Sequence, residues 1–208
     1  MPFIGIVPPT NRVGGLPGAA STFSTGSAPL NQIVDGTALN TPGLVAWYKE
    51  PVFGKISVLA YAQALASIAA GDSLIHVAGF GATTINSAGA SVGNGLDTGF
   101  VAKAGTASAY SKQAWLFAGV AAAPVSNTGA YFWRYISGYV PFAKCGSVIA
   151  SGSPLILCPS TGGVLGKNAF SSATIVDATM TFPVGYTLQL TDAADASMAS
   201  IWLSGWYA

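Results

Sequence analysis

Few residues in this chain have side chains that could do chemistry. His76 is the single histidine, and it lies in the apolar segment 73–80, on the face of an expected strand that also carries Leu74 and Ala78. A zinc site needs several histidine, cysteine or carboxylate ligands brought together in one place. No second histidine and no cysteine pair at ligand spacing accompanies His76. We therefore interpret it as a half-buried, hydrogen-bonded residue and predict no metal site.

A serine motif offers a second candidate for chemistry. The run Gly89-Ala-Ser91-Val-Gly93 matches the G-x-S-x-G pattern of hydrolases. That pattern needs a strand before it and a helix after it, and its acid and histidine follow the serine. Ser91 instead lies among glycines and asparagines, and His76 precedes it. We therefore do not expect a hydrolase.

The acidic residues give no pair suited to general acid–base catalysis. They are scattered along the chain, at Asp35, Glu50, Asp72, Asp97, Asp177, Asp192 and Asp195. Phosphate-binding and calcium-binding loop patterns are also missing from the sequence. We predict that the protein is not an enzyme, that it has no catalytic, cofactor-binding or metal-binding residues, and that it needs no cofactor.

The two cysteines, Cys145 and Cys158, are too few for a disulfide framework. We interpret them as buried or half-buried free thiols. A bridge across a hairpin between them is left open, although synthesis in the cytoplasm argues against it.

Charge is unusually low in this sequence. Eight basic and seven acidic residues make up 7% of 208 residues, and the formal net charge is +1. An ordinary soluble domain carries about 25% charged residues. Phosphate binding needs clustered cations, whereas the basic residues here are scattered singly, so we expect neither a nucleic acid nor an anionic membrane as a partner.

The apolar content has a consequence for assembly. Hydrophobic residues make up 51% of the chain, and few charges remain to cover its surface. Large exposed apolar patches in soluble proteins mark interaction sites. We therefore predict a homo-oligomer.

The long uncharged stretches do not read as membrane spans. They cover 73–96, 113–133 and 145–166, and glycine, asparagine or proline interrupts them. The first residues lack the basic flank and the long apolar region of a secretory signal. We expect synthesis in the cytoplasm without export by the general route.

Residues 1–43 form a distinct N-terminal region. Six of the 12 prolines lie here, among many glycines, yet the region is also rich in apolar residues. Proline disfavours helix, so we predict an extended arm. Its apolar residues favour ordering against a neighbouring subunit; a floppy terminus and an arm folded onto its own domain remain alternatives.

The remaining chain is predicted to be all-β, as a β-sandwich or a small β-barrel, with one short helix. Residues 56–70 are the helix candidate, because they contain strong helix formers without glycine or proline. Residues 114–125 and 130–140 read as a hairpin joined by the turn 126–129. Two later segments alternate with period two, as strands with one buried apolar face and one wet face do: 186–191 and 199–204.

Two short segments of the sequence resemble each other. Residues 68–75 (IAAGDSLI) recur 81 positions later as residues 149–156 (IASGSPLI), so that Gly71 and Gly152 occupy the same expected turn. The echo predicts two related β-subdomains, 44–113 and 114–208.

Aromatic residues gather in one expected strand, at Tyr131, Phe132, Trp133, Tyr135 and Tyr139. Such residues can form a sugar-binding platform, a core or a subunit interface, and we favour the core and the interface.

The order of segments in residues 114–208 resembles the capsid decoration, or cement, proteins of tailed phages. The segments that carry the resemblance are Phe117-Ala-Gly-Val-Ala121, Gly129-Ala-Tyr-Phe-Trp133, Tyr135-Ile-Ser-Gly-Tyr-Val140, Val148-Ile-Ala-Ser-Gly-Ser-Pro-Leu155, Thr161-Gly-Gly-Val164, Val184-Gly-Tyr-Thr-Leu188 and Ser200-Ile-Trp-Leu-Ser-Gly205. The resemblance implies a small β-barrel or sandwich that binds the major capsid protein on the virion surface, often as a trimer. It implies no catalytic residue. Alternatives are a tail, fibre or minor capsid protein, and a carbohydrate-binding β-module that uses the aromatic strand.

Overall fold

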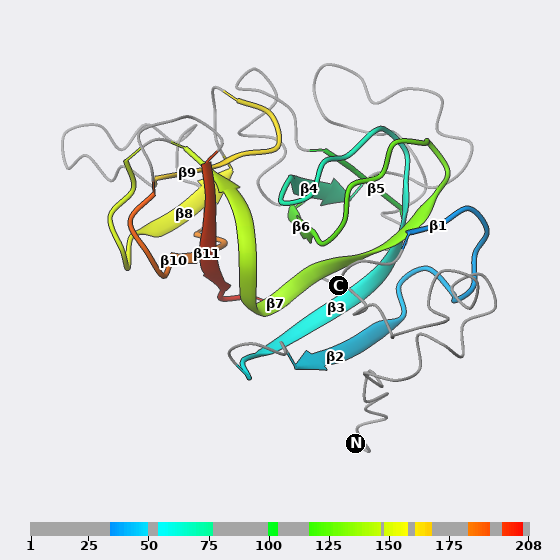
Figure 1. Ribbon diagram of the computed structural model, residues 1–208, viewed down its shortest axis with the longest axis horizontal. Coiled ribbons are helices and arrows are strands. Elements are labelled where there is room, and N and C mark those ends of the chain that lie inside the picture. The colour runs from blue at the N-terminus through cyan, green and yellow to red at the C-terminus, as the bar shows by residue number, and fades with distance from the viewer. Residues whose placement is uncertain are drawn as a thin grey trace, which may run out of the picture.

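The computed structural model describes residues 34–49, 54–76, 100–103, 117–146, 148–157, 161–167, 183–191 and 197–205. These residues form strands and connections without a helix, which confirms the all-β class (Figure 1). The strands are β1 (Val34–Asp35), β2 (Val45–Lys49), β3 (Ile56–Ala64), β4 (Ser73–His76), β5 (Phe100–Lys103), β6 (Phe117–Ala121), β7 (Tyr131–Cys145), β8 (Pro154–Leu157), β9 (Leu165–Lys167), β10 (Gly185–Thr187) and β11 (Ser197–Leu203).

The strands pair into two closed rings that share one strand. In the first ring, β3 pairs with β5, β5 with β4, β4 with β6, β6 with β7, and β7 with β3 again. In the second ring, β7 pairs with β9, β9 with β8, β8 with β10, β10 with β11, and β11 with β7 again. Figure 1 shows the two rings as lobes on either side of the long strand β7. Each ring is therefore a small closed β-structure rather than a sandwich of two sheets.

The two rings have the same topology. In each ring the first strand runs parallel to the third, at Ala64 with Val101 and at Cys145 with Leu165, and the other pairings are antiparallel. Ala64 and Cys145 are 81 positions apart. The sequence echo thus corresponds to a repeated strand order: β3, β4, β5, β6 and β7 of the first ring match β7, β8, β9, β10 and β11 of the second.

The echoed turn is the same in both rings. Gly71 and Gly152 have backbone φ angles of 79° and 77°, in the left-handed region that glycine adopts readily. The Gly71 amide donates to the carbonyl of Ala121 at 2.9 Å, and the Gly152 amide donates to the carbonyl of Thr187 at 2.8 Å. The division of the chain into two subdomains near residue 113 stays a prediction. Although β6 and the first half of β7 come after residue 113, their pairings place them in the first ring.

The predicted helix at residues 56–70 is wrong. Residues Ile56–Ala64 form β3, which pairs with β2 and β7 along most of its length. Ile68, farther along, bridges to Val125. Helix propensity is a weak preference that tertiary pairing overrides. Alanines suit β3 for a different reason, because Ala62 and Ala64 point into a narrow ring.

The core of the first ring is made of small and medium side chains. One buried cluster takes residues from all five of its strands: Ala62, Ala64, Leu74, Val101, Ala118, Ala121 and Phe132, with Ile68, Val125 and Ala130 beside them. A second and larger cluster joins side chains of both rings. The rings therefore pack against each other as well as sharing a strand.

The alternation in the two C-terminal segments has different outcomes. Ala199, Ile201 and Leu203 of β11 are buried as expected. In residues 186–191 the expected faces are reversed: Thr187 and Thr191 are buried, whereas Tyr186, Leu188 and Leu190 are exposed. The buried hydroxyls are satisfied, since Thr187 Oγ1 donates to the Ala150 carbonyl at 2.7 Å and Thr191 Oγ1 donates to the Gly146 carbonyl at 3.0 Å.

The end of the expected N-terminal arm lies on its own domain. β1 pairs with β7, and the Gly43 amide donates to the carbonyl of Tyr61 at 2.7 Å. The Tyr61 hydroxyl in turn donates to the Asp35 carboxylate at 2.9 Å. Residues 34–43 therefore belong to the folded body, and residues 1–33 lie outside the described part of the chain.

A search of the described residues finds no helix with the length and apolar character needed to cross a membrane.

Candidate functional site

The structure describes only some of the residues considered for chemistry. His76 is buried at the end of β4, opposite Val101. Ser91 and Cys158 lie outside the described residues, as do all the acidic residues except Asp35 and Asp72. The described residues contain no group of three histidine, cysteine or acidic side chains placed to hold a metal ion.

Cys145 is a free, buried thiol at the end of β7. Burial raises its pKa to about 12. The thiolate is the nucleophilic form of cysteine, so a thiol with a raised pKa is unreactive near neutral pH. Cys145 therefore acts as an apolar core residue.

Asp35 and Tyr61 form a buried hydrogen bond that fastens β1 to β3. Burial raises the pKa of the Asp35 carboxyl, and the hydrogen bond from Tyr61 partly opposes this shift. Burial also raises the pKa of Tyr61 above its usual value. The Leu39 amide donates to the same phenol oxygen, at 3.4 Å. This pair positions residues 35–39 and offers no open site to a ligand.

Arg134 lies inside the first ring. It is fully buried on β7, two residues after Phe132 on the same face, and its Nη1 donates to the carbonyl of Ala118. Burial lowers the pKa of its guanidinium to about 9. A side chain enclosed in this way supports the ring and has no access to an external anion.

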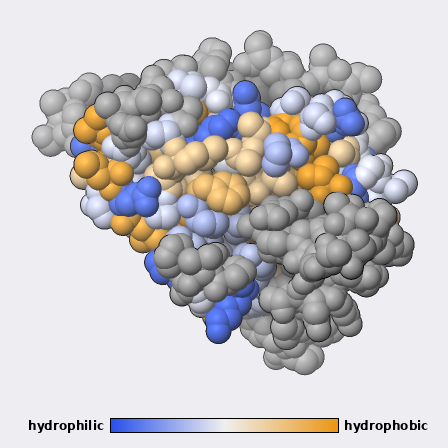
Figure 2. Space-filling view, in the orientation of Figure 1, coloured by the Kyte–Doolittle hydropathy of each residue, from blue (hydrophilic) through white to orange (hydrophobic). Residues whose placement is uncertain are grey.

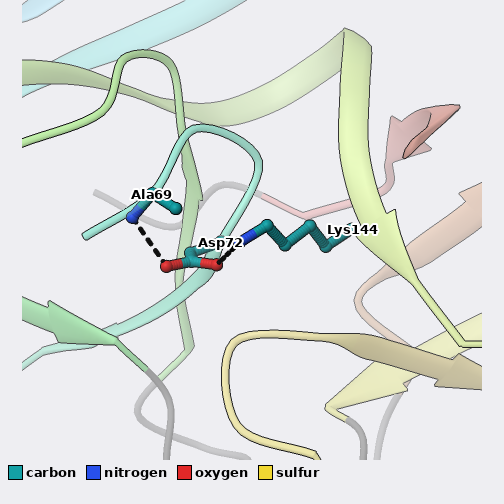
Figure 3. A network of polar contacts seen from close by, with 3 residues as sticks. All are labelled: Ala69, Asp72 and Lys144. Carbon is teal, nitrogen blue, oxygen red and sulfur yellow. Dashed lines mark hydrogen bonds and ion pairs between the residues drawn. The ribbon is translucent and has the colours of Figure 1, made fainter. Parts of the chain in front are cut away.

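Asp72 and Lys144 form an ion pair between the two rings (Figure 3). Lys144 Nζ lies 2.6 Å from Asp72 Oδ1, and the other carboxylate oxygen accepts a hydrogen bond from the Ala69 amide at 2.8 Å. The Lys144 amide also donates to the Gly71 carbonyl at 2.9 Å. Asp72 comes from the first ring and Lys144 from the second half of β7, so these contacts fix how the rings sit together.

The aromatic residues of β7 are core residues, as favoured from the sequence. Phe132, Trp133, Tyr135 and Tyr139 are buried, and Tyr131 is half-buried. Trp133 packs at a tilt on Tyr61 with ring centroids 5.2 Å apart. Because these rings are enclosed, this strand does not present a platform for a sugar.

Exposed apolar side chains instead gather on the outer face of β10 and β11. Tyr186 lies directly opposite Trp202, and the Leu188 amide donates to the Ser200 carbonyl at 2.9 Å. Tyr186, Leu188 and Trp202 are 42%, 38% and 43% exposed, and Ser200 is half-buried between them. We call these four residues the outer strip. The sequence contained its signal, the alternation in 186–190, but the apolar residues were assigned to the wrong face.

The surroundings of the outer strip are uncharged. The described residues of β10, β11 and their flanks, 183–191 and 197–205, contain no charged side chain. Figure 2 shows the same character more widely: on the face in view, strongly hydrophilic colour is confined to scattered residues between neutral and hydrophobic areas. A surface of this kind offers apolar contact and shape rather than charge.

Comparison with known proteins finds similarity to solved structures at low sequence identity. No protein-family model matches the chain, and no curated protein matches it. A similar solved structure is the crystal structure of the head fibre gp8.5 N base of bacteriophage phi29. The two chains share 13% sequence identity with a TM-score of 0.41, and the match covers 72% of this chain and 96% of the other.

Proposed function

We propose that the protein is a structural virion component, without enzymatic activity, that binds the major capsid protein on the outside of a phage capsid and reinforces the lattice as a homotrimeric cement protein. The outer strip is the observation that carries the proposal. Its large apolar side chains are exposed without charged neighbours, and exposed apolar surface of this kind marks a protein contact.

The rest of the body suits a binding role of this kind. Both rings are closed, so each of the nine strands that form them is paired on both sides within its ring, and β7 belongs to both rings. Closed strands do not invite uncontrolled edge-to-edge pairing. A rigid body also loses little conformational freedom when it binds, which favours attachment at many equivalent positions on a lattice.

The test is binding to particles and counting of copies. Capsids of the phage that encodes the chain, stripped of this protein, should bind the purified protein in co-sedimentation until a lattice-wide number of sites is filled. Quantitative mass spectrometry of intact particles should give hundreds of copies. A handful of copies per particle would replace the cement role by a tail, fibre or minor capsid role, and no copies would reject a virion component.

A carbohydrate-binding module is the second candidate, and one observation favours it. Tyr186 and Trp202 place two exposed aromatic rings at directly paired positions of adjacent strands, and exposed aromatic faces bind sugar rings. Titration with a panel of oligosaccharides, followed by tryptophan fluorescence, tests this role. Saturable quenching that is lost in Trp202→Ala would support it.

A further inference from the structure

The outer strip of the second ring has an equivalent in the first ring. The Thr187 amide donates to the Ser153 carbonyl at 3.1 Å, just as the Ala121 amide donates to the Asp72 carbonyl at 2.9 Å. Counting along the matched strands from these bonds, Tyr186 and Leu188 correspond to Val120 and Ala122. Through the paired residues of the next strand, Ser200 and Trp202 correspond to Trp133 and Tyr135.

The equivalent face of the first ring is covered. Val120, Ala122, Trp133 and Tyr135 are all at most 3% exposed and belong to the cluster that joins the two rings. Phe142, from the half of β7 that belongs to the second ring, packs edge-on against Tyr135 with ring centroids 6.1 Å apart. The second ring therefore helps to cover this face of the first ring. The matching face of the second ring, the outer strip, is exposed.

The turn beside this face shows the same difference independently. A Cβ atom at Gly71 would lie 3.0 Å from Met198 Sδ and 3.3 Å from the Lys144 amide nitrogen, both of the second ring. At Gly152, the matching position of the second ring, a Cβ would meet nothing within 4 Å. The second ring therefore packs against the Gly71 turn, whereas the matching Gly152 turn is open.

The same face of the first ring is also closed on its β3 side, where Tyr61 pairs with Trp133 and packs on it with ring centroids 5.2 Å apart. On β3, the first strand of the first ring, Tyr61 is fully buried and bonds to Asp35 and Leu39. β2 pairs along the neighbouring edge of β3. This face of the first ring is thus covered both from the second ring and by the chain that precedes β3, whereas the outer strip of the second ring is exposed.

We propose that the outer strip and the Gly152 turn are the surface by which copies of this chain associate, strip against strip. The covered counterpart shows that a second ring of the same kind can pack on part of this face, as Phe142 does on Tyr135. Because each chain has one such exposed strip, the strips of different copies meet around a symmetry axis and the assembly closes instead of growing. The inference deepens the proposed function, from which it takes the trimer, by assigning the self-contact to named residues.

The experiment measures mass in solution for the full chain and two sets of variants. Trp202→Glu places a charge in the centre of the strip, and Ser200→Arg does so while keeping both aromatic rings. Ile56→Glu is the matched control, because Ile56 is a similarly exposed apolar residue at the start of β3. Sedimentation velocity at micromolar concentration should give a trimer for the wild type and for Ile56→Glu, and the 20.9 kDa monomer for both strip variants. Circular dichroism identifies any variant that does not fold.

The outcomes separate this inference from the proposed function. Folded strip variants that remain trimeric would overturn the assignment of the strip, while capsid binding by the wild type would leave the proposed function standing. A wild-type protein that stays monomeric at 100 µM (roughly the range of weak interfaces) would overturn self-association. If the strip variants of such a monomer also failed to bind capsids, the strip would be a capsid contact instead.

Discussion

Gly71 and Gly152 occupy the same turn of two equivalent rings, with φ angles within two degrees of each other, yet only Gly71 is enclosed. The pair separates two effects of a glycine-to-alanine change. Gly152→Ala should lower the free energy of unfolding by only about 1–2 kcal/mol, the strain of a left-handed residue with a side chain. Gly71→Ala should lower it by about 1–3 kcal/mol more through overpacking. Urea denaturation measures both, and equal losses would show that the ring-to-ring contact at Gly71 is loose.

The ion pair between the rings yields a second prediction. Lys144→Met should destabilise the protein by about 3 kcal/mol, because it leaves the Asp72 carboxylate buried without its cation. Adding Asp72→Ser should recover much of this loss, since the second ring has Ser153 at the matching position. Thermal or urea denaturation of the single and double variants tests the pair. A double variant less stable than Lys144→Met alone would contradict the argument.

Arg134 gives a third prediction, because its counterpart in the second ring is Ile201. Arg134→Met fills similar volume without burying a charge, so it should fold with a change in stability below about 2 kcal/mol, whereas Arg134→Ala should lose about 2–5 kcal/mol through a cavity. Since burial lowers the pKa of Arg134 to about 9, wild type should gain stability relative to Arg134→Met above pH 9. A constant difference between pH 7 and pH 10 would show that the guanidinium is well solvated.

The stability of the β1 attachment should depend on pH through Asp35. Burial raises the pKa of this carboxyl in the folded protein, so the folded state binds the proton more tightly than the unfolded state does. The contribution is fully present below the unfolded pKa of about 4 and is lost as the pH rises through the folded pKa. Wild type should therefore lose stability relative to Asp35→Asn between pH 4 and pH 7 in urea denaturation. An unchanged difference would mean that Asp35 titrates normally.

Truncation at two positions tests where the arm ends. Deleting residues 1–33 should leave the body folded, because the described contacts begin at β1. Deleting residues 1–43 should destabilise it, because this removes β1 and the Asp35 partner of Tyr61. Circular dichroism and thermal denaturation compare the two truncations. If the longer deletion is as stable as the shorter one, residues 34–43 do not cap the first ring.

The sequence predicts the class of the fold better than its details. Turn residues and period-two alternation are local signals, and they correctly predicted the antiparallel pairing of β6 with β7 and the faces of β11. The residues on either side of the expected turn 126–129 do not pair with each other: Val125 bridges to Ile68, and Ala130 accepts from the Ala64 amide. The helix prediction at 56–70 was wrong because alanines were read as helix formers. In β3 they fill the small core of the first ring, which is built with strands far away in the chain. The reversed face of residues 186–191 has a related cause: buried threonines there bond to the backbone of residues 146–153, and such distant acceptors are invisible in the local pattern.

The candidate site was harder to predict than the fold. Low charge density correctly raised the expectation of exposed apolar surface, but composition does not place it. The aromatic residues of β7 and those of the outer strip are of the same types. The buried set is covered by the core of the first ring, by Tyr61 and by Phe142, and the exposed set is not. The IAAGDSLI echo was the strongest available clue, since it relates the two faces that differ.

The shared strand β7 has a consequence for how this protein can be divided. A chain of two separate domains can be cut at a linker into two intact halves. Here, a cut before β7 leaves the first ring without its last wall, and a cut after β7 leaves the second ring without its first. No single break in the chain produces two complete rings, so neither ring can be separated from the other. Both rings depend on the fifteen residues of β7.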